Sequence, residues 1–155
     1  MDTTQRLLSR LAIEELNAEF AWLIDHDQSD KVADLFTESG SYGRSTGERS
    51  VGRPAIREAY AARKAHGPRT ARHIFTNLRL VHESPARILG TVILTLFAQD
   101  GPPPHVAEPF LVADYEDVYA LCEAGRWRYE SRTVTWLFVR SDGKLSPLKL
   151  GKAAK

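Results

Sequence analysis

The sequence predicts an α+β fold in which helices come first and an antiparallel sheet of about four long strands follows. Apolar residues recur at helical spacing over the first part of the chain, whereas segments after Thr70 are rich in β-branched and aromatic residues. Helices followed by consecutive strands favour an antiparallel sheet over a parallel βαβ arrangement. The 155 residues fit one domain, which we expect over residues 1–140. Residues 141–155 form a polar tail that is either partly disordered or docked on a neighbour.

Three helices are expected in the first part of the chain. Residues 4–27 place apolar side chains three or four positions apart, which predicts a long amphipathic helix. A short second helix is expected over residues 30–37, where Asp30 is a suitable N-cap. Gly52-Arg53-Pro54 opens a third helix because proline suits the first helical turn, and Gly67-Pro68 ends it.

Four long strands are expected in the rest of the chain. A proline-rich loop at residues 100–104 separates the second strand from the third. A tight turn at Glu123-Ala124-Gly125 joins the last two strands, and a short additional strand is expected around Tyr42. The predicted long strands cover residues 72–82, 87–99, 109–122 and 126–140.

Both faces of the predicted sheet carry apolar residues. Val92, Leu94 and Leu96 share one face by strand alternation, while Ile93 and Phe97 lie on the other. Helices can cover only one of these faces. We therefore expect the second face to pack against another subunit.

Composition and charge exclude several classes of protein. Lys and Arg total 21 and Asp and Glu total 20, so the chain lacks the basic excess of nucleic-acid-binding proteins. No segment approaches the roughly 18 apolar residues of a membrane span. Arg6, Arg10 and Glu14 interrupt the first apolar positions, so no signal peptide is expected and we predict a cytoplasmic location. A single cysteine, Cys122, cannot form an internal disulfide.

Two side chains are candidates for chemistry. His73 lies at the start of a predicted strand, beside the apolar pair Ile74-Phe75, and alternation places it on the same side as Phe75. Asp25 ends the apolar stripe of the first helix, where the helix dipole disfavours a carboxylate. Asp27 is an alternative to Asp25, because aspartates commonly begin turns. A purely structural role for these residues also stays open.

An aspartate paired with a histidine is a plausible general base. The carboxylate accepts one imidazole N–H, fixes the tautomer and supports the protonated ring, while the other nitrogen takes a proton from the substrate. Such a pair requires no cofactor. We expect no metal site, because too few ligands can be identified that converge. Phosphate-binding, dinucleotide-binding, zinc-protease and serine-hydrolase motifs are absent from the sequence.

Six segments follow one another in a recognisable order and spacing: Ala12-Ile13-Glu14-Glu15-Leu16, Leu23-Ile24-Asp25, Leu35-Phe36, Val51-Gly52-Arg53-Pro54-Ala55-Ile56, Arg72-His73-Ile74-Phe75-Thr76-Asn77, and Gly125-Arg126-Trp127-Arg128-Tyr129-Glu130-Ser131-Arg132. With them the chain resembles the SnoaL-like branch of the NTF2-like, or cystatin-like, superfamily. The resemblance covers nearly all of residues 5–140. It implies a cone made of a curved sheet with the helices packed across it.

Within this branch, the chain is most similar to the group of scytalone dehydratase, bile-acid dehydratase and dehydrochlorinase. Asp25 and His73 fall on the dyad that performs base-assisted elimination in that group, and Tyr42 falls on a tyrosine that can assist a departing hydroxyl. The resemblance implies a cofactor-independent lyase of dehydratase type, or an isomerase, acting on a small apolar molecule. Strand alternation and the family cone together give the expected pocket lining: Leu94, Leu96, Tyr129 and Ser131.

The chain also departs from this group. Phe20 stands where the dehydrochlorinase pattern has a lysine, which disfavours halide elimination. His105 is a loose match to the second histidine of scytalone dehydratase. The same fold serves non-catalytic ligand-binding proteins and the small subunits of ring-hydroxylating dioxygenases, which are the alternative function. Family members form homodimers or homotrimers through the sheet, and the sequence does not distinguish the two.

Overall fold

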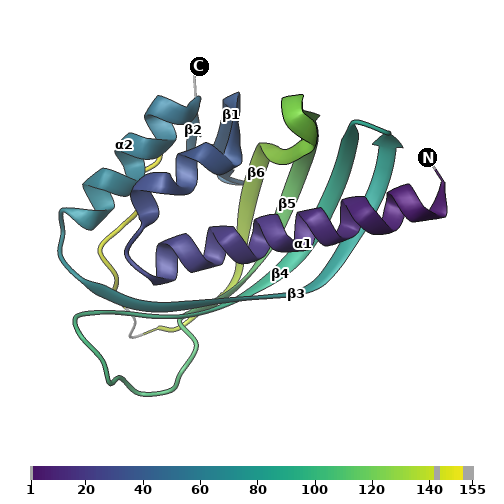
Figure 1. Cartoon of the computed structure of the whole chain (residues 1–155). Helices are drawn as coiled ribbons and strands as arrows, with labels where there is room; N and C mark the ends of the chain where they lie inside the picture. The colour runs from purple at the N-terminus through teal and green to yellow at the C-terminus, as the bar shows by residue number, and fades with distance from the viewer. Residues whose placement is uncertain (1, 142–143, 152–155) are drawn as a thin grey trace.

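A computed structural model describes residues 2–141 and 144–151 of the chain. Helices occupy the first part and long strands the rest, as predicted (Figure 1). The helical elements are α1 (Thr3–Asp25), η1 (Ser29–Leu35), α2 (Arg53–Lys64) and η2 (Glu123–Gly125). The strands are β1 (Phe36–Arg44), β2 (Arg49–Val51), β3 (Arg69–Ser84), β4 (Arg87–Asp100), β5 (Leu111–Cys122) and β6 (Arg126–Val139).

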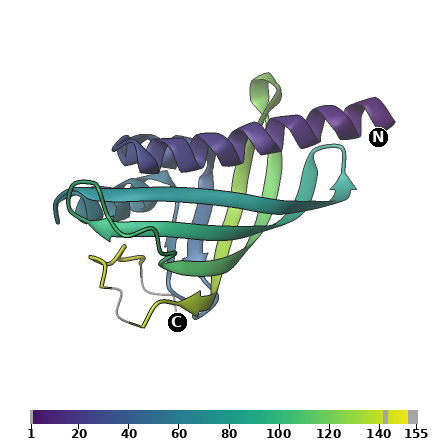
Figure 2. The same ribbon diagram turned by 90° about the horizontal axis from the view of Figure 1, so that it is seen from below.

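The strands form one curved sheet in the order β2-β1-β6-β5-β4-β3. The four long strands pair antiparallel, which confirms the predicted α+β class. The sheet differs from the prediction at one edge, where β1 runs parallel to β6 and β2 adds a short antiparallel strand. Helix α1 lies across the concave face, with η1 and α2 beside it over β1 (Figures 1 and 2).

Helix α1 begins with a capping box, in which the Asp2 carboxylate accepts the backbone N–H of Gln5 and the Gln5 side chain accepts that of Asp2. It ends at Asp25, two residues earlier than predicted. The chain turns there because Asp27 adopts a left-handed conformation with φ of 64°, which aspartate tolerates better than most residues. The buried stripe Ile13, Leu16, Phe20 and Leu23 faces the sheet. Asp25, the last residue of the helix, therefore lies on the concave side of the sheet.

Strand β3 bends where it passes beneath α1. Its register with β4 shifts between Thr76 and Arg79, and Asn77 in between has φ of 57°. An extra residue of this kind bends a strand and increases its twist. This bend closes β3 and β4 around the helix and gives the sheet its conical shape (Figure 2).

The described part of the C-terminal segment, residues 144–151, packs on the domain itself. Leu145, Leu148 and Leu150 contact the core, and the Gly151 carbonyl accepts the backbone N–H of Arg49. Figure 2 shows this segment running back from the end of β6 toward α2. The expected polar tail thus includes apolar anchors. Among residues 2–141 and 144–151, none of the helices has the length and hydropathy that a membrane span requires.

Candidate active site

Asp25 and His73 meet although 48 positions separate them in the chain. Asp25 Oδ1 lies 2.6 Å from His73 Nδ1, and Asp25 Oδ2 accepts the backbone N–H of His73 at 2.8 Å. The Asp25 side chain is 5% exposed and that of His73 is 10% exposed. Two-point attachment of one carboxylate fixes both the ring and the strand that carries it.

This contact determines which ring nitrogen is available for chemistry. An ionised carboxylate can only accept hydrogen bonds, so Nδ1 carries the proton in the neutral ring. The lone pair is then on Nε2. His73 lines the main cavity, so the arrangement suits proton abstraction by Nε2.

The cavity beside His73 lies inside the cone and has a volume of about 320 Å³. Aliphatic and aromatic side chains form its inner walls. Its charged end is lined by Asp27, Arg63, Lys64 and Arg69. This volume falls within the range typical of small-molecule sites. The inner walls include Ile24, Ala71, Leu94, Leu96, Ala98, Phe110 and Leu111, and Leu145 and Leu148 add to the lining from the C-terminal segment.

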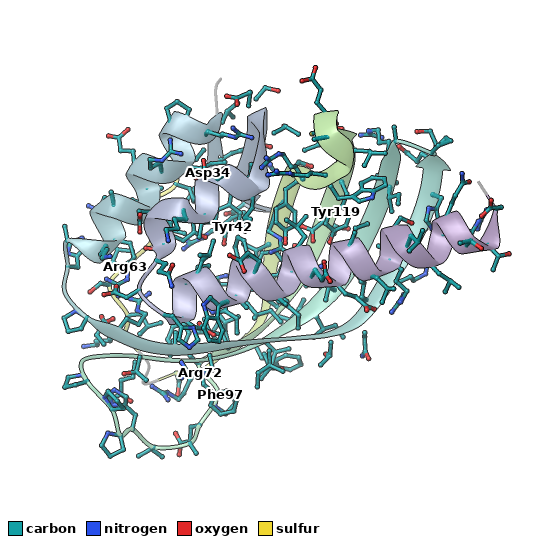
Figure 3. The ribbon with its side chains drawn as sticks, viewed as in Figure 1. Asp34, Tyr42, Arg63, Arg72, Phe97 and Tyr119 are labelled. Carbon is teal, nitrogen blue, oxygen red and sulfur yellow. The ribbon has the colours of Figure 1, made fainter. Side chains whose placement is uncertain are left out.

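Three tyrosines form the polar part of the inner cavity. The hydroxyls of Tyr42 and Tyr115 share a hydrogen bond of 3.2 Å, and the ring of Tyr60 stacks on that of Tyr42 with centroids 6.2 Å apart. Burial raises the pKa of Tyr60 and Tyr115 well above the ordinary value, and the neighbouring Tyr42 raises both further. These two phenols stay neutral at any physiological pH and can donate a hydrogen bond to a substrate oxygen. Figure 3 shows Tyr42 on the helix-covered side of the sheet.

Three of the five predicted pocket residues line the cavity, and two do not. Tyr42, Leu94 and Leu96 line the cavity with His73. Tyr129 and Ser131 do not line it, which corrects the prediction from strand alternation. A bulge in β6 accounts for Ser131: Tyr129 pairs with Tyr119, whereas Ser131 pairs with Val118, so the alternation shifts by one residue between them. Tyr129 does face the interior, but it packs against Phe20 and Phe36 in the core and not along the cavity.

Because of this bulge, Arg132 instead of Ser131 faces the interior. Its guanidinium is fully buried and donates to both carboxylate oxygens of Asp117, at 2.8 and 2.9 Å. The rings of Phe20 and Tyr129 lie 4.4 and 4.2 Å from it. Phe20, at the position where the dehydrochlorinase pattern has a lysine, therefore packs against a buried arginine. Burial lowers the pKa of Arg132, but the charge of Asp117 outweighs it and raises the pKa well above its ordinary value.

The remaining sequence candidates lie elsewhere. Asp27 is largely exposed at the charged end of the cavity, where it pairs with Lys64 at 3.7 Å, so Asp25 is the carboxylate next to His73. His105 hydrogen-bonds to the Gly101 carbonyl in the proline-rich loop and does not line the main cavity. Within residues 2–141 and 144–151, no group of three or more His, Cys, Asp or Glu side chains is placed to hold a metal ion.

Sequence reasoning missed Tyr60, Tyr115 and the charged end of the cavity. Tyr60 lies on the buried stripe of α2, and Tyr115 alternates with outward residues of β5, so both have the pattern of ordinary core residues. Their hydroxyls converge with that of Tyr42 only in three dimensions. The available signal is that α2 and β5 each carry a tyrosine among their buried residues.

Comparisons with known proteins agree with this architecture. A family model described as a SnoaL-like domain matches residues 5–133. A protein named as a candidate scytalone dehydratase, from Novosphingobium aromaticivorans, has a similar structure, with 15% identity, 99% of each chain covered and a TM-score of 0.80. LinA is 19% identical, with 95% of this chain and 99% of that chain covered and a TM-score of 0.75.

A third similar structure comes from a multisubunit enzyme. It is the β subunit of a candidate aromatic-ring-hydroxylating dioxygenase from Novosphingobium aromaticivorans, with 16% identity, 87% of this chain and 93% of that chain covered and a TM-score of 0.72. At these identities the structural likenesses establish the fold. A sequence search of curated proteins finds no match.

Proposed function

The chain belongs to the SnoaL-like domain family, and on that premise we propose that it is a cofactor-independent lyase with Asp25 and His73 as its general-base dyad. The favoured reaction is a dehydratase-type elimination on a small, largely apolar substrate. An isomerisation would begin with the same proton abstraction. The observation that carries the proposal is the 2.6 Å contact between Asp25 Oδ1 and His73 Nδ1 beside the apolar cavity.

In the proposed reaction, Nε2 of His73 removes a proton from a carbon next to a substrate carbonyl. The electron pair of the broken C–H bond forms the new double bond as the C–O bond to the leaving hydroxyl breaks. The hydroxyl departs as water after taking a proton, which the protonated ring can return. The Asp25 carboxylate holds the ring and stabilises its positive charge.

The tyrosine hydroxyls provide the complementary hydrogen bonds. Tyr42 lines the cavity and shares its hydroxyl hydrogen bond with Tyr115. A phenol placed there can donate to the carbonyl oxygen or to the leaving hydroxyl, where negative charge develops. Such donors are most effective in an apolar site from which water is excluded.

The name of one similar structure, a scytalone dehydratase candidate, supports this reaction class. Phe20 in place of the lysine of the dehydrochlorinase pattern favours loss of water over loss of halide.

The proposal is tested with a panel of bicyclic β-hydroxyketones, since loss of water from them gives conjugated enones that absorb in the ultraviolet. Positioned general-base catalysis contributes roughly 10²–10⁴-fold, so His73→Gln should lower turnover by that factor. His105→Gln is the matched control, because His105 lies outside the cavity, and it should retain full turnover. Full turnover by a folded His73→Gln protein would contradict the proposal.

The alternative is an accessory subunit of a ring-hydroxylating dioxygenase. The structural likeness to such a β subunit favours it. In that case His73 would only tie β3 to the end of α1. Co-purification with a larger iron–sulfur protein, together with unchanged behaviour of the His73→Gln variant, would support this alternative.

We also propose that the chain forms a homodimer or homotrimer through the outer face of the sheet. Phe138 is 69% exposed near the end of β6, and Ile74 is 45% exposed on β3. Figure 3 shows Arg72 and Phe97, which pair across β3 and β4, on the outer side of the sheet. Sedimentation should give a dimer or trimer at micromolar concentration, and a monomer there would contradict this proposal.

A further inference from the structure

Two arginines share one carboxylate at the charged end of the cavity. Arg69 Nε lies 2.8 Å from Asp100 Oδ1, and Arg63 Nη2 lies 3.6 Å from the same oxygen. The side chains of Arg63 and Arg69 are only 11% and 18% exposed, and both line the cavity. Figure 3 shows Arg63 near the end of α2.

The other two cations of the lining have carboxylates of their own. Lys64 pairs with Asp27 at 3.7 Å, and Arg44 pairs with Glu48 at 3.3 Å. The cluster of Arg63, Arg69 and Asp100 therefore has one positive charge in excess, held largely out of water.

An excess buried charge is costly unless a counter-charge compensates it. Burial and the nearby charge of Arg69 lower the pKa of Arg63 by more than the charges of Asp100 and Asp27 raise it. Burial on its own would raise the pKa of Asp100, but hydrogen bonds from Arg69 and Ser146 outweigh it and lower the pKa to about 2. Asp100 is thus fully ionised at neutral pH and still neutralises only one of the two arginines.

The register of β3 and β4 places this cluster in line with His73. Arg69 pairs with Asp100, Ala71 with Ala98, and His73 with Leu96. Arg69 and His73 are four positions apart along β3, a distance of roughly 13 Å. The two small alanines between them leave a slot with the excess cation at one end and the imidazole farther in.

We propose that the molecule this cavity takes is an apolar carboxylate, with its acid group on Arg63 and Arg69 and its body against Ala71, Ala98 and Leu96. Arg63 Nη1 already donates to the Gly67 carbonyl and Arg69 Nη2 to the Ser146 carbonyl, so the acid group takes the remaining N–H groups of the two guanidiniums. The reacting carbon then lies on the order of 10 Å from the acid group. The part of this assignment that concerns His73 rests on the proposed function, whereas the anion site does not.

Calorimetric titration with 2-naphthoate and its neutral analogue 2-naphthamide tests the anion site. The wild type should bind naphthoate at least about tenfold more tightly than naphthamide, since hydrogen bonds to charged groups are the strong ones. Arg63→Gln should abolish this preference. Arg57→Gln, on the same helix but paired with Asp34 at the surface, should preserve it.

Asp100→Asn gives a result in the opposite direction. Removing the shared carboxylate leaves two excess positive charges, so naphthoate should bind several-fold more tightly while naphthamide binding stays unchanged. Loss of folding cannot produce tighter binding, so this variant decides the question even if Arg63→Gln is unstable.

Equal binding of the two naphthalenes to the wild type, no saturable naphthoate binding at millimolar concentration, or a preference that survives in Arg63→Gln would overturn the proposal. So would weaker naphthoate binding by a folded Asp100→Asn protein. His73→Gln separates the two proposals. It should bind naphthoate with unchanged preference while losing turnover, so full turnover in that variant contradicts only the general base.

Discussion

Replacing Asp25 by asparagine tests the dyad with a nearly isosteric change. The wild-type carboxylate accepts two hydrogen bonds from His73, one from the ring and one from the backbone, and its side chain is 5% exposed. The amide has only one oxygen, and the backbone N–H of His73 can only donate, so the oxygen must face the backbone and the NH₂ must face the ring. Nδ1 must then accept, and the proton moves to Nε2.

The expected loss follows from these contacts. A hydrogen bond to a charged group contributes about 1.5–3 kcal/mol, which corresponds to at least about tenfold in rate if it acts only in the transition state. A protonated Nε2 also has no lone pair for the substrate, and the equivalent change in the serine-protease triad costs about 10⁴-fold. We therefore expect Asp25→Asn to lower turnover by about 100-fold or more.

Two measurements check this expectation. Enone formation from a bicyclic β-hydroxyketone gives the turnover, and ¹⁵N chemical shifts of the His73 ring give the tautomer. The wild type should carry its proton on Nδ1 and the variant on Nε2. Asp30→Asn, an exposed aspartate on η1, is the matched control and should change neither readout. Unchanged turnover or an unchanged tautomer in Asp25→Asn would refute the reasoning.

Three further predictions concern the walls of the cavity and its charged end. Tyr42→Phe should lower turnover about tenfold with little change in melting temperature, because it removes one hydroxyl that contacts Tyr115; an unchanged kcat would exclude Tyr42 as a hydrogen-bond donor to the substrate. Ala98→Leu should fill the slot and abolish naphthoate binding while thermal unfolding stays cooperative, and calorimetry that still shows binding would place the ligand elsewhere. The pKa of Asp100 falls from 3.8 to about 2 on folding, so its contribution is present above pH 4 and is lost as the pH falls toward 2. Because the Asp100 side chain is 35% exposed, we expect about 1 kcal/mol of acid-dependent stability, which urea unfolding should detect in the wild type and not in Asp100→Asn.

The sequence was sufficient to predict the α+β class and to name His73, with Asp25 or Asp27, as candidates, and the family resemblance then favoured Asp25. Helical periodicity and strand alternation are local patterns, and both remain visible in the structure over α1, β4 and β5. The choice between Asp25 and Asp27 depended on where α1 ends. That end is set by the left-handed conformation of Asp27, which the residue types alone permit but do not dictate.

Other features depended on irregularities and on long-range pairing. Because of the bulge in β6, Arg132 faces the interior where Ser131 was expected. The residue types around the bulge do not predict it. The arginines at the end of the cavity come from α2 and β3, and their shared carboxylate ends β4, so only the register of the folded sheet brings them together. The C-terminal segment was expected to be polar because lysines dominate its composition, yet three spaced leucines anchor it.

The central claim is that His73 removes a carbon-bound proton inside the cavity. Its most direct test is deuterium exchange at the acidic carbon of 2-tetralone in D₂O, followed by proton NMR with catalytic amounts of protein. The wild type and His105→Gln should accelerate exchange equally, and His73→Gln should return the rate to that of buffer alone. Equal acceleration by His73→Gln and the wild type, or no acceleration by the wild type, would contradict the claim.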